Sequence, residues 1–258
     1  MSDTLLILSV LPSVLLGRYI YKKDVVEKES RKLLTKLIIV GVLSTFTTLI
    51  ITLIVSSIFP VLSADESSLD LFSLAVHVFF GIAIIEEFSK WIWNYFVSWK
   101  NEEFNYLYDA IVYSVFVSLG FATFENILYV FEGALTGIGY TIALYRMVLA
   151  VPAHAFFGVT MGYYLGLAKL LEINGDKDKS SIYKLLSVIM PTTYHFLYDY
   201  LIMANLEGIF YLFVVYLYIV SFRKVKKISS VTTNLFGNND NAYGIFGNSN
   251  GVVNYEKK

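Results

Sequence analysis

The sequence predicts an all-α fold, a polytopic bundle of about seven transmembrane helices, with the N-terminus outside and the C-terminus in the cytoplasm. Hydrophobic residues make up 56% of the 258 residues and charged residues 16%, with a mean hydropathy of +0.61. This composition leaves too little polar surface to cover a soluble domain. The apolar residues form long runs, and lysine and arginine gather in alternate connections between them. The alternation typical of a membrane β-barrel is absent.

Seven apolar runs are long enough, or nearly so, to cross about 30 Å of hydrocarbon, which takes about 20 helical residues. In chain order they are 4–20, 37–62, 70–98, 106–131, 137–168, 182–204 and 207–222. Lipid offers backbone groups no hydrogen-bond partners, so each run is predicted to be a helix. No basic region precedes the first run and no A-x-A-like cleavage site follows it, so we interpret it as a membrane span rather than a signal peptide.

The basic residues predict the orientation of these spans. They gather in the connections 18–36 and 169–184 and after the last span at 223–227. Lysine and arginine are missing from the alternate connections 63–70, 132–139 and 203–208. The connection 99–105 holds one lysine and two glutamates and is uninformative. Because basic loops stay in the cytoplasm, the first set is predicted to lie inside and the second outside.

The chain divides into a predicted transmembrane domain, 1–228, and a tail, 229–258, rich in asparagine and glycine. Such a tail cannot bury a core and is predicted to be disordered and cytoplasmic. The chain has no cysteine, which excludes disulfides, thiolate metal sites and cysteine nucleophiles. We expect a lipid bilayer around the protein, in the cell membrane, and no nucleic-acid partner.

Ionisable residues inside the spans are the strongest indication of function, because charges at membrane depth are costly and usually mark a pathway or a reaction site. They lie on four separate spans: Glu86-Glu87 with Lys90, Glu125-Asn126, His154, and His195 with Asp199. Counted along the helices at about 1.5 Å per residue, all of them fall in one slab at mid-membrane or in its outer half. The sequence therefore predicts one shared polar site.

Glu86 and Glu87 lie four and three residues before Lys90, so all three are predicted to share one helical face. A partly desolvated carboxylate beside a lysine suits a general base that activates water. An internal salt bridge that joins two helices is the alternative.

The other clusters offer partners for such a base. Glu125 follows a small-residue stretch, 120–123, that lets another helix approach closely, and it is a candidate second base, metal ligand or hydrogen-bond acceptor. Asn126 offers an amide N–H to a developing oxyanion. His195 and Asp199 lie one turn apart, where a hydrogen bond would fix the imidazole tautomer.

Two prolines and a third histidine complete the set of unusual residues. Pro152 is predicted to kink its span and to free the Val148 carbonyl near His154, and Pro191 repeats this pattern in the next span. His77 has no acidic neighbour at helical spacing, so it is predicted to be a satisfied interior residue.

Taken together, the motifs resemble those of PrsW-type intramembrane proteases, which are distantly similar to the CAAX prenyl endopeptidases and bacteriocin-immunity-type membrane proteases. The matching motifs are Glu86-Glu87-x-x-Lys90, Phe121-x-x-x-Glu125-Asn126, Arg146 followed by Pro152-x-His154, and His195-x-x-x-Asp199. The resemblance covers about residues 80–200. The CAAX enzymes have arginine in place of Lys90 and histidine in place of Glu125, so it does not imply a prenylated substrate.

The resemblance implies hydrolysis of a peptide bond in a single-span membrane protein, such as an anti-sigma factor. It implies that Glu86 activates water, with Glu87 and Lys90 tuning its charge. His154 and His195 would then stabilise the oxyanion or relay protons. Glu125, Asn126 and Asp199 would orient these two histidines.

A metal ion is the open point of this mechanism. Glu125, His154 and His195, with Glu86 or Glu87, would form a ligand set with an open position that suits zinc. No H-E-x-x-H pair is present and the ligands come from separate helices, so we favour a mechanism in which no cofactor is required.

Two alternatives remain at this stage. A proton-coupled transporter or channel would use the same Glu/His cluster as a relay, although no inverted repeat supports transport. A catalytically inactive binding protein would keep the fold alone. For a protease, we expect cleavage near the extracytoplasmic end of the substrate's span, because a substrate helix unwinds at least cost near the aqueous boundary.

Overall fold

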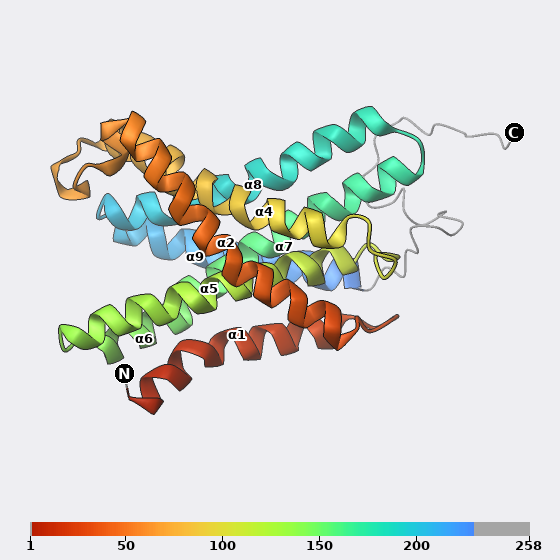
Figure 1. Cartoon of the computed structure of the whole chain (residues 1–258), viewed down its shortest axis with the longest axis horizontal. Coiled ribbons are helices and arrows are strands. Elements are labelled where there is room, and N and C mark those ends of the chain that lie inside the picture. The colour runs from red at the N-terminus through yellow and green to blue at the C-terminus, as the bar shows by residue number, and fades with distance from the viewer. Residues whose placement is uncertain (1, 230–258) are drawn as a thin grey trace, which may run out of the picture.

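The computed structural model describes residues 2–229, and across this range the regular structure is entirely helical. Seven long helical stretches form a bundle (Figure 1). In chain order the helices are α1 Asp3–Lys23, α2 Arg31–Ile58, α3 Leu71–Val76, the π-helical η3 His77–Ala83, α4 Ile84–Ser98, α5 Asp109–Leu135, α6 Gly139–Val148, α7 Ala150–Ile173, α8 Lys177–Met203 and α9 Glu207–Ser229. The short 3₁₀ turns η1 Pro60–Ser63 and η2 Glu66–Ser68 lie between α2 and α3.

The predicted membrane bundle is confirmed. Within residues 2–229, six stretches are long and apolar enough to cross a membrane: α1, α2, the continuous α3–η3–α4, α5, the pair α6–α7, and α9. The seventh long helix, α8, has 27 residues and is more polar. Each of the seven predicted spans corresponds to one of these stretches. Which end faces the cytoplasm stays a prediction, and the predicted tail, apart from Ser229, lies outside the described residues.

Helix α5 lies at the centre of the bundle, packed mainly against α7, α2 and α1 (Figure 1). Gly120 of α5 meets Gly41 of α2 so closely that a Cβ atom on Gly120 would lie 2.3 Å from the Ile38 carbonyl oxygen. On α7, a Cβ on Gly162 would lie 2.4 Å from the Ala110 carbonyl oxygen. Small residues therefore bring α5 against both neighbours, as the stretch 120–123 predicted for one of them.

The kink predicted in the fifth span is a complete break between α6 and α7, at Leu149. Pro152 occupies the first turn of α7, where a missing N–H costs no helical hydrogen bond. The Val148 carbonyl is free of the helix, as predicted, but it accepts a hydrogen bond of 2.6 Å from the Tyr218 hydroxyl of α9. It is therefore not available to the polar site. Pro191 lies inside α8, which continues past it as one helix.

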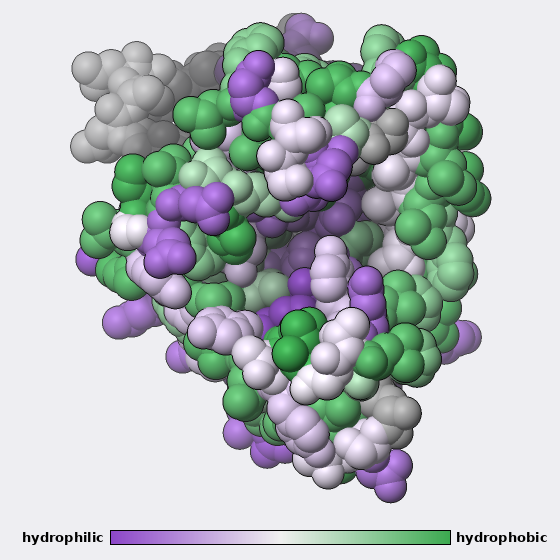
Figure 2. Space-filling view, turned by 90° about the vertical axis from the view of Figure 1, so that its left-hand side faces the viewer, coloured by the Kyte–Doolittle hydropathy of each residue, from purple (hydrophilic) through white to green (hydrophobic). Residues whose placement is uncertain are grey.

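The two ends of the bundle differ. One end bears the connections 24–30, 99–108 and 174–176, and the opposite end bears 59–70, 136–138 and 204–206 (Figure 1). Viewed from this second end, the surface is hollowed at its centre, and hydrophilic side chains line the hollow (Figure 2). Polar groups inside the bundle are thus approached from the end that carries 59–70.

Candidate active site

Helix α4 presents Glu86, Glu87 and Lys90 on one face, as their spacing predicted. Lys90 Nζ donates to Glu87 Oε1 at 2.6 Å and lies 3.6 Å from Glu86 Oε2. The side chains of Lys90 and Glu87 are fully buried, whereas that of Glu86 retains 11% of its exposure. The π-helical η3 ends three residues before Glu86. Single π-helical turns inside α-helices are frequent at functional sites.

Helix α8 brings His195 to this carboxylate pair. His195 Nδ1 lies 3.0 Å from Glu87 Oε1, and Nε2 lies 3.0 Å from Asp199 Oδ2 and 3.9 Å from Glu86 Oε2. The predicted one-turn pair of His195 and Asp199 is therefore present. With a carboxylate beside each ring nitrogen, the imidazole is held as an N–H donor in both directions.

Helix α7 brings His154 to the other side of Lys90. His154 Nδ1 lies 3.1 Å from Lys90 Nζ, and Nε2 lies 3.1 Å from Glu125 Oε2 of α5. Glu125 also accepts a hydrogen bond of 2.6 Å from Arg146 Nη2 at the end of α6. Lys90 donating to Nδ1 would leave Nε2 to carry the proton and donate to Glu125, which defines the tautomer.

Asn126 ties the site to α1. Its side-chain oxygen accepts a hydrogen bond of 2.9 Å from Arg146 Nε, and its amide donates to the Ser9 carbonyl at 2.8 Å. Asn126 is fully buried, and its amide N–H is directed to α1 rather than to the Glu86–Glu87 pair. It therefore holds Arg146 in place, and Arg146 in turn holds Glu125.

Aromatic rings close the site around these charges. Lys90 Nζ lies 4.2 Å from the centre of the Phe121 ring, which supports the ammonium group through a cation–π contact. The Phe157 ring stacks on His195 with centroids 4.8 Å apart, and the His154 and His195 rings are 5.3 Å apart. Both imidazoles are buried, with His154 5% and His195 3% exposed, and burial strengthens the electrostatic interactions between them and their partners.

All eight residues predicted for the site lie in one continuous network of ion pairs and hydrogen bonds, contributed by α4, α5, α7 and α8. Arg146 belongs to one of the matching motifs but had no predicted role; in the structure it joins Glu125 to Asn126. His77 lies apart from the network, buried, with Nδ1 3.2 Å from the Val61 carbonyl oxygen. This confirms the prediction of a satisfied interior histidine.

The network leaves two buried carboxylate oxygens, Glu86 Oε2 and Glu87 Oε2, without a hydrogen-bond partner among residues 2–229. Glu86, Glu125 and Asp199 keep 11%, 18% and 19% of their side-chain exposure. The site thus combines a fully buried pair, Glu87 with Lys90, and a rim of carboxylates that solvent reaches. A water molecule bound to Glu86 Oε2 would supply the hydrogen bond that this oxygen lacks.

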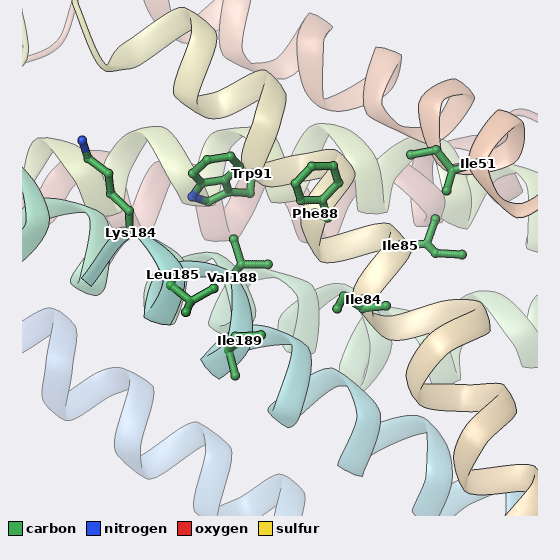
Figure 3. A pocket seen from close by; sticks show the side chains of 9 residues that line it. All are labelled: Ile51, Ile84, Ile85, Phe88, Trp91, Lys184, Leu185, Val188 and Ile189. Carbon is green, nitrogen blue, oxygen red and sulfur yellow. The ribbon is translucent and has the colours of Figure 1, made fainter. Parts of the chain in front are cut away.

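An apolar groove of about 620 Å³ runs along the outside of the helices that carry Glu86 and His195. Its side chains come from α2, α4 and α8 and converge on one space (Figure 3). They are Ile51, Ile84, Ile85, Phe88, Trp91, Lys184, Leu185, Val188 and Ile189. In a membrane such a groove holds lipid chains or an apolar protein segment.

A charge-paired site of carboxylates and imidazoles, enclosed by membrane-spanning helices, marks a functional centre. A model of the PrsW family intramembrane metalloproteases matches residues 29–223. The chain is 36% identical to Protease PrsW of Geobacillus kaustophilus over 220 residues, which cover 84% of this chain and 89% of that protein. It is 33% identical to Protease PrsW of Bacillus subtilis, over 86% of this chain and 94% of that protein.

The chain therefore belongs to the PrsW family of intramembrane proteases, a multi-pass class of the cell membrane. The comparison with solved structures finds no significant match. Family membership confirms the resemblance drawn from the four motifs and does not favour the transporter or channel alternative.

Proposed function

We propose that the protein is an endopeptidase that hydrolyses a peptide bond of a single-span membrane protein, such as an anti-sigma factor, with water activated by Glu86. The observation that carries this proposal is Glu86 Oε2, a buried oxygen that accepts no hydrogen bond, on a side chain that keeps partial exposure beside Lys90 and His195. A general base needs an oxygen that is free to take a proton from water, which supports Glu86 in this role.

In this mechanism Glu86 takes a proton from water while the water oxygen forms a bond to the substrate's carbonyl carbon. The carbonyl oxygen becomes an oxyanion, which His195 Nε2, lying between Asp199 and Glu86, is suited to stabilise. When the carbon–nitrogen bond breaks, the proton held by Glu86 passes to the leaving nitrogen. Glu87 and Lys90 stay paired throughout and set the charge next to Glu86.

His154 acts from the opposite side of Lys90. Its contacts with Lys90 and Glu125 fix the ring, and Arg146 fixes Glu125. We propose that these contacts orient the ammonium group of Lys90 towards the carboxylate pair, and that His154 relays protons released during turnover. Asn126, which reaches only Arg146 and α1, is a positioning residue.

The family is one of metalloproteases, which implies a metal ion at the site. Glu86, His154 and His195 each offer an atom within 4.8 Å of the others, and two histidines with one glutamate suit zinc in type. However, every ring nitrogen of both histidines already contacts a charged side chain, and Lys90 Nζ lies at hydrogen-bond distance from His154 Nδ1. Zinc would have to displace Lys90 from one imidazole and a carboxylate from the other.

As arranged, the residues do not fit a zinc ion, and we propose that Lys90 is the resident cation of the site. Its ammonium group compensates Glu86 and Glu87 at short range. A zinc ion would place further positive charge beside that ammonium group, which opposes binding.

Substrate access follows from the hollow and the groove. By the positive-inside rule, the hollowed end, which hydrophilic side chains line (Figure 2), is extracytoplasmic. We propose that the substrate's membrane span lies along the apolar groove (Figure 3) while its outer end unwinds into the hollow. Cleavage then falls at, or just beyond, the extracytoplasmic end of the span.

The test is cleavage of a co-expressed single-span substrate by Glu86→Gln, with Glu132→Gln as the matched control. Glu132 is an exposed glutamate of α5. Glu86→Gln should accumulate in the membrane at the wild-type level and produce no cleavage product, while Glu132→Gln should cleave normally. Cleavage at the wild-type rate by Glu86→Gln would show that another group activates water.

A further inference from the structure

A second group of buried carboxylates lies at the end of the bundle away from the hollow. Asp24 and Glu29 come from the connection between α1 and α2, and Asp109 is the first residue of α5. Each offers an oxygen within 4.8 Å of the others. The three residues are 3%, 5% and 1% exposed, so three carboxyl groups share a space that solvent hardly reaches.

Hydrogen bonds hold two of these groups in place. Asp109 Oδ2 accepts from the backbone N–H groups of Asn105 and Tyr106, at 3.0 and 2.7 Å. The Tyr113 hydroxyl donates to Glu29 Oε2 at 2.9 Å. These bonds use one oxygen of each carboxylate and fix its direction.

Two oxygens of the cluster remain without partners. Asp24 Oδ2 and Asp109 Oδ1 are buried and accept no hydrogen bond from any residue in the range 2–229. Each belongs to a side chain that is more than nine-tenths buried. Buried polar atoms in folded proteins nearly always have a partner, so these two carboxylate oxygens are free to bind a water molecule or an ion.

No basic side chain of the described residues forms an ion pair with Asp24, Glu29 or Asp109. Lys28, the lysine of this connection, donates instead to the backbone carbonyls of Tyr21 and Asp24. Buried carboxylates that form no ion pair are strongly unfavourable as anions, so bound protons or a cation must offset their charge.

We propose that Asp24, Glu29 and Asp109 bind a hard divalent cation, Mg²⁺ or Ca²⁺. Carboxylate oxygens are the ligands that both ions prefer, and the three residues offer no nitrogen or sulfur donor. With metal–oxygen distances of about 2.0 to 2.6 Å, one ion can contact oxygens up to about 4 to 5 Å apart, and the three carboxylates offer oxygens within 4.8 Å of one another.

The cation would join two connections that also hold each other through side chains. Ser30 donates from its backbone N–H and hydroxyl to Glu103, and Asn105 donates to Glu27. Asp109 begins the central helix α5, which carries Glu125 further along. The bound ion clamps the start of α5 to the α1–α2 connection and stabilises the bundle at the end opposite the proposed catalytic site.

Thermal unfolding of the purified full-length protein in detergent tests this site. The protein is first stripped with EDTA, and Mg²⁺ or Ca²⁺ is then titrated separately. We expect a saturable rise in Tm with at least one of the two ions, and the ion that acts at the lower concentration is the ligand. Tb³⁺, a probe for oxygen-rich calcium-type sites, should show luminescence excited through tyrosine, because Tyr113 contacts Glu29.

Four variants make the test specific. Asp24→Asn and Glu29→Gln keep the size of the side chain and its ability to form hydrogen bonds but remove its negative charge. Both should therefore abolish the Tm rise and the luminescence. Each should also be more stable than the wild type in EDTA, because a buried charge is gone. Glu27→Gln, in the same connection and exposed, should respond like the wild type, and so should Glu86→Gln, which separates this site from the proposed catalytic site.

The proposal is wrong if neither ion raises Tm and Tb³⁺ gives no luminescence, since the carboxyl groups would then be neutralised by protons alone. It is equally wrong if Asp24→Asn and Glu29→Gln keep the wild-type response. If one of these variants does not fold, the other decides. Neither outcome bears on proteolysis, which is tested through Glu86.

Discussion

Replacing Lys90 by methionine tests how the catalytic site is held together. The Lys90 side chain is fully buried, and Nζ lies 2.6 Å from Glu87, 3.6 Å from Glu86 and 3.1 Å from His154 Nδ1. Methionine fills similar space but leaves the two carboxylates without their shared cation. Breaking a buried ion pair on one side costs about 3–5 kcal/mol.

That cost sets the size of the expected effect. For a chain of this size, each kcal/mol shifts Tm by about 2–4 °C, so Lys90→Met should lower Tm by about 6–20 °C by the same rule. Lys36→Met, which removes an exposed lysine of α2, is the matched control and should change Tm by about 1 °C or less, as most surface substitutions do.

A double variant separates charge balance from catalysis. Lys90→Met with Glu87→Gln removes both members of the closest pair and should recover much of the lost Tm, because replacing both partners of a buried pair is far less costly than removing one. Cleavage of a single-span substrate should stay absent, because the charge beside Glu86 is still missing. Thermal unfolding in detergent and cleavage in cells are the two measurements. A Tm of Lys90→Met within about 2 °C of the wild type would refute the buried-cation reasoning.

The remaining predictions concern positioning, packing and topology. Arg146→Lys should reduce cleavage about tenfold, equivalent to about 1.4 kcal/mol, since lysine cannot donate to both partners of the guanidinium group; unchanged activity would contradict its positioning role. Gly120→Ala should lower Tm by several degrees because its Cβ would meet backbone at 2.3 Å, whereas Gly208→Ala, with open space around it, should not. Single cysteines at the exposed positions Ser67 and Ser181 in this cysteine-free chain should react with a membrane-impermeant reagent from opposite sides; labelling from one side would overturn the proposed orientation.

The helical spans were predictable because their signal is local. Lipid requires long apolar helices, so the apolar runs mark the helical stretches within a few residues at most ends. The grouping of Glu86, Glu125, His154 and His195 was predictable for a related reason, because ionisable side chains at membrane depth face the bundle interior and pair with one another.

Other features depend on contacts between helices and leave no local pattern. The π-helical η3 and the break at Leu149 arise from packing, and Pro152 indicated the break only approximately. Arg146 joins the site because α6 packs against α5, which its sequence neighbours do not reveal. Asp24 and Glu29 looked like ordinary loop residues, because only the fold brings them to Asp109.

The most direct test of the central claim is cleavage by purified protein in lipid vesicles. A single-span substrate is incubated with wild type or Glu86→Gln, with Mg²⁺ present and with or without 1,10-phenanthroline, which removes transition metals. Mass spectrometry then identifies the product termini. We expect the wild type to cut at the extracytoplasmic end of the substrate's span, both with and without the chelator. We expect Glu86→Gln to give no cleavage product. Cleavage by Glu86→Gln at the wild-type rate, or loss of wild-type cleavage that zinc restores, would contradict the account.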